Sequence, residues 1–261
     1  MSAADGAAGG DGATGREGPV GPVAILTAIA EESRPLRRRM SGARRVAGPG
    51  LSLWKGELGA RKVLLAETGA GARAAAAAGL FARFAPARWL GAGFAGALSP
   101  GLPFGSIVVA TELADGSGGA EAALDPAMAR RALACDAAAR AVRAVSSAEI
   151  VATRAAKARL LSSAGGSLPV TVDMESAAWA RAGSGIPGLL VRVVTDSAED
   201  EIAEFVAASV AGDGGIDRGR LLRHAIFHPS SIGKLLALRR RARLCGERLA
   251  DFVERFAARG F

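Results

Sequence analysis

Residues 189–196 read Leu-Leu-Val-Arg-Val-Val-Thr-Asp, a nearly continuous apolar run that ends in a threonine and an acid. Such a run is typical of a strand buried on both faces of a parallel sheet. Comparable runs lie at residues 23–28, 62–67, 88–92, 106–111 and 170–173. Alanine-rich stretches of helical composition separate several of them, at residues 34–40, 72–84, 126–144 and 176–182. This alternation predicts an α/β layer fold with a mostly parallel sheet.

The charge of the chain is unevenly distributed. The 261 residues are 50% hydrophobic and 22% charged, which is enough to bury a sizeable core. From Arg218 to Phe261 there are 11 basic and 3 acidic residues, which account for the whole net charge of +8. This distribution argues against a generally basic protein that coats nucleic acid, and we expect no nucleic-acid partner.

We expect three parts along the chain. Residues 1–21 are rich in glycine and alanine and lack the apolar core of a signal peptide, which indicates a disordered tail. Residues 22–216 form the globular domain, and residues 217–261 form a basic, amphipathic helical extension. No apolar run approaches the roughly 18 residues that a spanning helix needs, so we expect a cytoplasmic protein.

Cysteine and histidine chemistry is not expected in the globular part. Cys135 and Cys245 are too far apart for a Cys-x-x-Cys pair. His224 and His228 lie in the basic extension, where Pro229 interrupts the turn, and we expect no metal site. Without a histidine in the body, a Ser-His-Asp or Cys-His mechanism is excluded there, and acid–base chemistry falls to carboxylates.

Acids and glycines follow several of the predicted strands. Ligands of α/β folds bind at the carboxyl ends of the strands, so these residues are expected to share one rim. A lone acid after a strand is commonly a helix cap, but several acids at one sheet end indicate a site. The stretches are Glu31-Glu32, residues 68–71, residues 91–96, residues 173–176 and Thr195-Asp196.

The glycine-rich stretches have more than one interpretation. Residues 91–96 spell G-x-G-x-x-G, but Pro100 and Pro103 prevent a long helix there, which disfavours a dinucleotide site. Two readings stay open: a turn that lets a ligand approach backbone amides, or a tight turn required by packing. The turn at Gly69 and Gly71 could hold an anion or a sugar hydroxyl, assisted by Arg73.

Taken in order, these blocks resemble the nucleoside phosphorylase/nucleosidase superfamily, in particular the methylthioadenosine/S-adenosylhomocysteine nucleosidases. The resemblance covers about residues 23–200. It is carried by residues 24–32, 68–71, 93–98, 102–109, 172–176 and 191–196. It implies a three-layer α/β/α fold with a central mixed, mostly parallel sheet and a helical C-terminal extension. We expect no cofactor, with phosphate as the one candidate co-substrate, and a homodimer or higher homo-oligomer.

The resemblance also implies roles for individual residues. Glu32 would be the general base that activates water, and Asp196 would protonate or hydrogen-bond the purine N7. Cleavage of an N-glycosidic bond passes through an oxocarbenium-like state that carboxylates stabilise, and an acid kept at neutral pH needs the raised pKa that burial provides. The implied substrate-binding set is Gly69, Gly71, Phe94, Ala95, Gly96, Asp173, Met174, Glu175 and Thr195, with Arg73 as a candidate phosphate contact.

Some positions depart from the nucleosidase pattern. Phe94 stands where those enzymes usually have serine, and residues 150–154 supply no aromatic ring for the base. The hopanoid-associated phosphorylase-like proteins are more similar, since they share residues 172–176, a lysine at Lys157 and a proline-bearing tail such as residues 213–238. This similarity implies release of adenine from adenosylhopane. The alternatives are a methylthioadenosine/S-adenosylhomocysteine nucleosidase, another purine nucleoside phosphorylase, a nucleoside-binding protein that is not an enzyme, and an NAD oxidoreductase.

The basic extension carries one apolar stripe with steps of three and four residues, which predicts a single amphipathic helix. Three interpretations are open: a helix packed on the body, a helix drawn to anionic lipid at the inner face of the membrane, or a dimerisation seam. The stripe comprises Leu235, Leu238, Ala242, Cys245, Leu249, Phe252 and Phe256.

Overall fold

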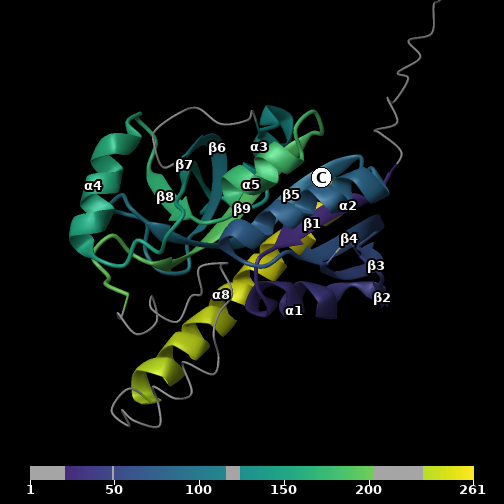
Figure 1. Ribbon diagram of the computed structural model, residues 1–261, viewed down its shortest axis with the longest axis horizontal. Helices are drawn as coiled ribbons and strands as arrows, with labels where there is room; N and C mark the ends of the chain where they lie inside the picture. The colour runs from purple at the N-terminus through teal and green to yellow at the C-terminus, as the bar shows by residue number, and fades with distance from the viewer. Residues whose placement is uncertain (1–20, 49, 116–123, 203–231) are drawn as a thin grey trace, which may run out of the picture.

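The computed structural model describes residues 21–48, 50–115, 124–202 and 232–261, which fold around one sheet (Figure 1). Within these ranges nine strands pair in the order β2-β3-β4-β1-β5-β8-β7-β6-β9. Their bounds are β1 (Val23–Thr27), β2 (Ser41–Val46), β3 (Ser52–Leu58), β4 (Arg61–Glu67), β5 (Arg88–Ala97), β6 (Ile107–Asp115), β7 (Arg140–Ser146), β8 (Val170–Asp173) and β9 (Gly188–Asp196).

The sheet closes on itself beyond β5. An additional pairing of β5 with β9 joins β5, β8, β7, β6 and β9 into a ring. β5 pairs in parallel with β1 and β9, and it pairs antiparallel with β8 only at Gly96 and Ala97. Of the nine pairings between described strands, five are parallel and four antiparallel, so the predicted mixed, mostly parallel sheet is confirmed.

Alternate residues of the central strands supply two separate cores. Val191 of β9 packs with α1 (Ala30–Arg39), α3 (Pro126–Leu133) and α8 (Ile232–Ala258) on one face. Leu190 packs on the other face with the short helix η1 (Gly71–Ala76), α2 (Ala77–Phe84) and α5 (Ser176–Ala182). The two faces explain why the strand is apolar at residues 189–194 apart from Arg192. The helix α4 (Arg154–Ala164) packs in a smaller third cluster.

The predicted helix over residues 126–144 is wrong in its second half. α3 ends at Leu133, and residues 140–146 form β7, which pairs in parallel with β6 and β8. The alanines of this segment favour a helix, but Val142 and Ala144 alternate with more exposed residues and are buried between strands. Tertiary pairing therefore overrides local propensity. The strands β2 and β3 were not predicted, and β2 is mostly exposed.

The G-x-G-x-x-G motif lies within β5 and forms no turn, so both readings of it as a turn are wrong. Packing requires the glycines. A Cβ at Gly91 would lie 2.6 Å from a Leu190 methyl carbon and 2.7 Å from the Trp179 ring. A Cβ at Gly93 would lie 3.0 Å from the Glu32 carboxylate. The missing side chains therefore allow α5 and α1 to approach the strand closely.

α8 lies beside α1, and its two halves differ (Figure 1). Cys245, Leu249, Phe252 and Phe256 of the predicted stripe are buried in the core, so this half packs on the body. In the N-terminal half Leu238 is 42% exposed, against expectation for a stripe residue. His224, His228 and residues 1–20 and 213–217 lie outside the described residues. None of the described helices is long and apolar enough to cross a bilayer.

Candidate active site

Glu32 is buried in the first turn of α1, where backbone amides hold both carboxylate oxygens. Oε2 accepts hydrogen bonds from the N–H groups of Ala28 (2.7 Å) and Ile29 (3.2 Å), and Oε1 accepts one from Phe94 (2.8 Å). Burial raises the pKa of Glu32 to about 7, although these amides and the charge of Arg192 favour ionisation. Near neutral pH the carboxyl group therefore populates both forms, as a general base requires.

Arg192 is the central cation of the site and is only 1% exposed. Its Nε donates to Oδ2 of Asp173 (3.0 Å), its Nη2 donates to Oγ of Ser176 (2.7 Å), and its guanidinium lies 4.8 Å above the centre of the Trp179 ring. The predicted site residues did not include Arg192. The signal that could have identified it is a lone charge inside the apolar run 189–194, because a buried charge needs a partner.

Asp173 is the ionised partner of Arg192. Burial works against its charge, but Arg192 and the hydrogen bonds from Ser176 hold the pKa of Asp173 below its ordinary value. Its Oδ1 also accepts from the N–H groups of Glu175 (3.0 Å) and Ser176 (2.8 Å) and from Oγ of Ser146 (3.2 Å). Asp173 therefore has several protein partners and organises the start of α5.

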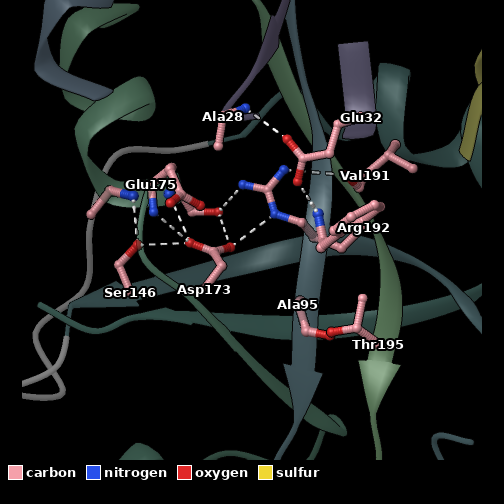
Figure 2. Close-up of polar contacts among 12 residues, drawn as sticks. Ala28, Glu32, Ala95, Ser146, Asp173, Glu175, Val191, Arg192 and Thr195 are labelled. Carbon is pink, nitrogen blue, oxygen red and sulfur yellow. Dashed lines mark hydrogen bonds and ion pairs between the residues drawn. The ribbon is translucent and has the colours of Figure 1, made fainter. Parts of the chain in front are cut away.

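Glu175 has the opposite protonation preference. Burial, together with the charges of Asp173 and Glu32, raises the pKa of Glu175 to about 8. Its Oε1 accepts a hydrogen bond from the N–H of Gly71 (3.0 Å). Figure 2 shows Arg192 between Glu32 on one side and Asp173 and Glu175 on the other. Burial therefore drives Glu32 and Glu175 towards their neutral forms, while Asp173, which is paired directly with the guanidinium, stays ionised.

Asp196 ends β9, with its side chain 13% exposed. Its Oδ2 accepts from Nζ of Lys157 (2.6 Å), and its Oδ1 accepts from Oγ1 of Thr195 (2.9 Å). A Cβ at Gly96 would lie 2.9 Å from Oδ2 of Asp196, so this glycine makes room for the carboxylate. The contact with Lys157 was not predicted, because the two residues come from distant parts of the chain.

These acids meet around one cavity of about 230 Å³. Ile150, Val151 and Ile202 contribute an apolar part of the wall. The predicted site residues that the structure brings to this cavity are Glu32, Phe94, Ala95, Gly96, Asp173, Met174, Glu175, Thr195 and Asp196.

Gly69, Gly71 and Arg73 are not among the residues that line the cavity. The N–H of Gly69 donates to the carbonyl of Ala28 (3.0 Å), and the N–H of Gly71 donates to Glu175. Both amides thus have acceptors within the protein, and the role of Gly69 and Gly71 in holding an anion or a sugar hydroxyl stays a prediction. Arg73 is exposed. The turn acts on the site indirectly, by supporting Glu175.

The chain resembles known proteins in sequence family and in fold. The family model described as "Phosphorylase superfamily" matches residues 22–214. No curated protein matches the chain.

Three solved structures illustrate the likeness in fold. The 5'-methylthioadenosine/S-adenosylhomocysteine nucleosidase from Streptococcus pneumoniae, with a transition-state inhibitor, is 20% identical at a TM-score of 0.69, covering 91% of this chain and 98% of that one. The 5'-methylthioadenosine/S-adenosylhomocysteine nucleosidase from Neisseria meningitidis, in complex with methylthio-immucillin-A, is 21% identical to the chain at a TM-score of 0.69. The match covers 92% of this chain and 100% of that one. The futalosine hydrolase of Helicobacter pylori is 16% identical at a TM-score of 0.71, and the match covers 92% of this chain and 98% of that one.

Proposed function

Since the chain belongs to the phosphorylase superfamily, we propose that it cleaves the N-glycosidic bond of an adenosine-like nucleoside and releases adenine. One observation carries the proposal: Glu32, Glu175 and Asp196 line the same cavity, and the first two have pKa values of about 7 and 8. Carboxyl groups near their pKa at neutral pH suit proton transfer in a site that has no histidine among its lining residues.

In the proposed reaction the C1′–N9 bond breaks and its electron pair moves into the purine. Asp196 protonates N7, so that the base leaves as neutral adenine. Glu32 removes a proton from the water that adds to C1′. Glu175 hydrogen-bonds the ribose hydroxyls, and Met174 packs against the sugar. The carboxylate charge around the cavity favours the oxocarbenium-like transition state.

We propose water as the nucleophile. The support is Glu32, whose three amide donors fix a carboxylate with a pKa of about 7 at the cavity wall. The turn that was the candidate phosphate site supports Glu175, and Arg73 does not line the cavity. Hydrolysis predicts that the rate of adenine release is unchanged when phosphate is added, and a dependence on phosphate would establish phosphorolysis.

The finer proposal is a lipid-linked nucleoside, adenosylhopane, with α8 in contact with anionic lipid. Its support is the N-terminal half of α8, where Leu236 (60% exposed) and Leu244 (49% exposed) accompany exposed Arg239, Arg240 and Arg243. Such a surface suits the interface of an anionic bilayer. We expect the protein to co-sediment with phosphatidylglycerol vesicles and not with phosphatidylcholine vesicles. Binding to neither would contradict the membrane contact.

The experiment that tests the proposed function is adenine release from methylthioadenosine, adenosine and adenosylhopane, each with and without phosphate. The Asp196→Asn variant removes the acid, and we expect adenine release to fall by about 100-fold or more. Full release by this variant would refute the role of Asp196. A wild-type protein that binds these nucleosides but turns none over would instead be a nucleoside-binding protein.

A further inference from the structure

Lys157 is a fully buried cation next to the acid that the proposed function requires. Its residue is 1% exposed, and its Nζ lies 2.6 Å from Oδ2 of Asp196. Asp196 lines the cavity, whereas Lys157 is absent from its lining. Lys157 therefore acts on a substrate only through Asp196, and any role it has in the reaction is carried by this contact.

The ammonium of Lys157 has three acceptors for its three N–H bonds. Besides Asp196 it donates to the carbonyl oxygens of Ser197 (2.6 Å) and Asp200 (3.0 Å). The backbone is shaped for this contact, because Oδ2 of Asp200 accepts from the N–H of Ser197 (3.0 Å). The side chain of Thr153 caps the start of α4 through the N–H of Ala156 (3.1 Å), which places Lys157 in the first turns of the helix.

The hydrogen bonds at Asp196 leave it without a proton of its own to give. Oδ2 accepts from Lys157, and Oδ1 accepts from Oγ1 of Thr195 at 2.9 Å, the shorter of the two contacts of that hydroxyl. A carboxylate that accepts a hydrogen bond at each oxygen carries no proton that it could donate to a leaving base. A departing adenine nevertheless needs a proton at N7. Of the two side chains shown donating to Asp196 in the described part of the chain, Lys157 is the cation and Thr195 is a neutral hydroxyl.

We propose that Lys157 and Asp196 together form the proton donor, with Lys157 as the positioning residue that reloads the carboxyl group. A proton moves from Nζ to Asp196, and Asp196 passes a proton to N7 as the C1′–N9 bond breaks. Lys157 is left as a neutral amine and regains its proton from water after adenine leaves. This inference rests on the proposed function, since it assigns the source of the proton in that reaction.

The surroundings of Nζ suit both states of the amine. A neutral amine has two N–H bonds and one lone pair. The two N–H bonds match the carbonyl oxygens of Ser197 and Asp200, and the lone pair then faces Asp196. Transfer of the proton from Nζ to Asp196 therefore leaves no buried donor without an acceptor, and at this stage it removes two opposite charges at once. Once N7 has taken the proton, Asp196 is an anion again beside the neutral amine, and this favours the return of a proton from water to Nζ.

The test is adenine release across a pH range by the wild-type protein and two variants. Lys157→Gln keeps two N–H donors but has no proton to give. Lys157→Arg keeps the cation but does not release its proton at these pH values. We expect kcat at neutral pH to fall by about 100-fold or more in both variants, with KM unchanged, because Lys157 touches no substrate. At lower pH the rate of Lys157→Gln should recover relative to that of the wild type, since solvent then protonates Asp196 directly, whereas the protonation of Glu32 slows both proteins alike.

Arg159→Met is the matched control, because it removes an exposed cation from the same helix. Wild-type rates in Lys157→Arg, or a pH profile of unaltered shape in Lys157→Gln, would overturn the proposal and leave Lys157 as a structural clamp. If thermal unfolding shows that either Lys157 variant does not fold, the result for the other Lys157 variant tests the proposal. A wild-type protein that releases no adenine would overturn the proposed function and this inference together, whereas an active wild type with equally active variants overturns only the inference.

Discussion

The backbone N–H of Phe94 donates to Oε1 of Glu32 across 2.8 Å, joining strand β5 to helix α1 although 62 residues separate the two positions. The contact fixes the carboxylate at the wall of the cavity and supplies a donor that stabilises its charge. The position of Glu32 therefore depends on the packing of α1 against β5, which the small residue Gly93 permits. This geometry makes the proposed base testable.

Glu32→Gln should reduce adenine release by about 100-fold or more, because an amide neither accepts a proton from water nor accepts hydrogen bonds at its nitrogen. In the wild-type protein the rate should rise as pH increases through about 7, where Glu32 loses its proton. This rise of the rate near pH 7 should be absent from the pH profile of the Glu32→Gln variant. Glu31→Gln, a neighbour outside the cavity lining, is the control, and an equal loss in both would contradict the assignment.

The high pKa of Glu175 predicts an effect of pH on stability. The folded-state pKa of about 8 lies above the ordinary value of 4.5, so the folded protein binds the proton more tightly than the unfolded chain. The resulting stabilisation is fully present below pH 4.5 and is lost as pH rises through about 8. Thermal unfolding of Glu175→Gln should therefore depend less on pH in this window. Parallel profiles for the two proteins would contradict the raised pKa.

Arg192→Met should destabilise the fold by about 3–5 kcal/mol, because it leaves the buried charge of Asp173 without its partner. Urea unfolding measures this free energy. Asp173→Asn combined with Arg192→Met should recover part of the loss, since the double variant no longer buries a lone charge. Arg130→Met, which removes an exposed side chain, is the control and should change little. A single variant as stable as the wild type would show that the pair is dispensable.

Gly96→Ala should impair adenine release while the protein stays folded. The added methyl group would lie 2.9 Å from Oδ2 of Asp196, so the carboxylate must move. A displacement of this kind can cost up to about 100-fold in rate. Gly233→Ala provides the comparison, because a Cβ there meets nothing within 4 Å. Equal activity of the two variants would mean that the position of Asp196 is not critical.

Phe256→Ala should cost about 3–5 kcal/mol of unfolding free energy, because Phe256 is fully buried in the core shared by α8 and the sheet. Leu236→Ala, in the exposed half of the same helix, should change the free energy little. Urea unfolding of both variants checks the difference. Similar losses would show that the two halves of α8 are packed alike.

Much of the fold was predictable because it is encoded locally. The mostly apolar runs 23–28, 62–67 and 189–194 each match a strand, since burial on both faces favours apolar side chains at successive positions. Glu32, Glu175 and Asp196 lie at or just after the ends of β1, β8 and β9 and meet at one cavity, as expected for an α/β fold whose ligands bind at the carboxyl ends of strands. Residue type and order along the chain were therefore enough to predict the layer architecture and to identify these acids as candidate site residues.

Only the tertiary structure decided how those acids differ. Three contacts distinguish the acids: Arg192 with Asp173, Lys157 with Asp196 and Gly71 with Glu175. They form because the strands close into a ring and α4 and the starts of α5 and η1 converge on it. A pKa depends on burial and on charges a few ångströms away, and these neighbours come from segments 19 to 104 residues apart. For the same reason β7 is a strand despite its alanines, because pairing on both sides outweighs local propensity.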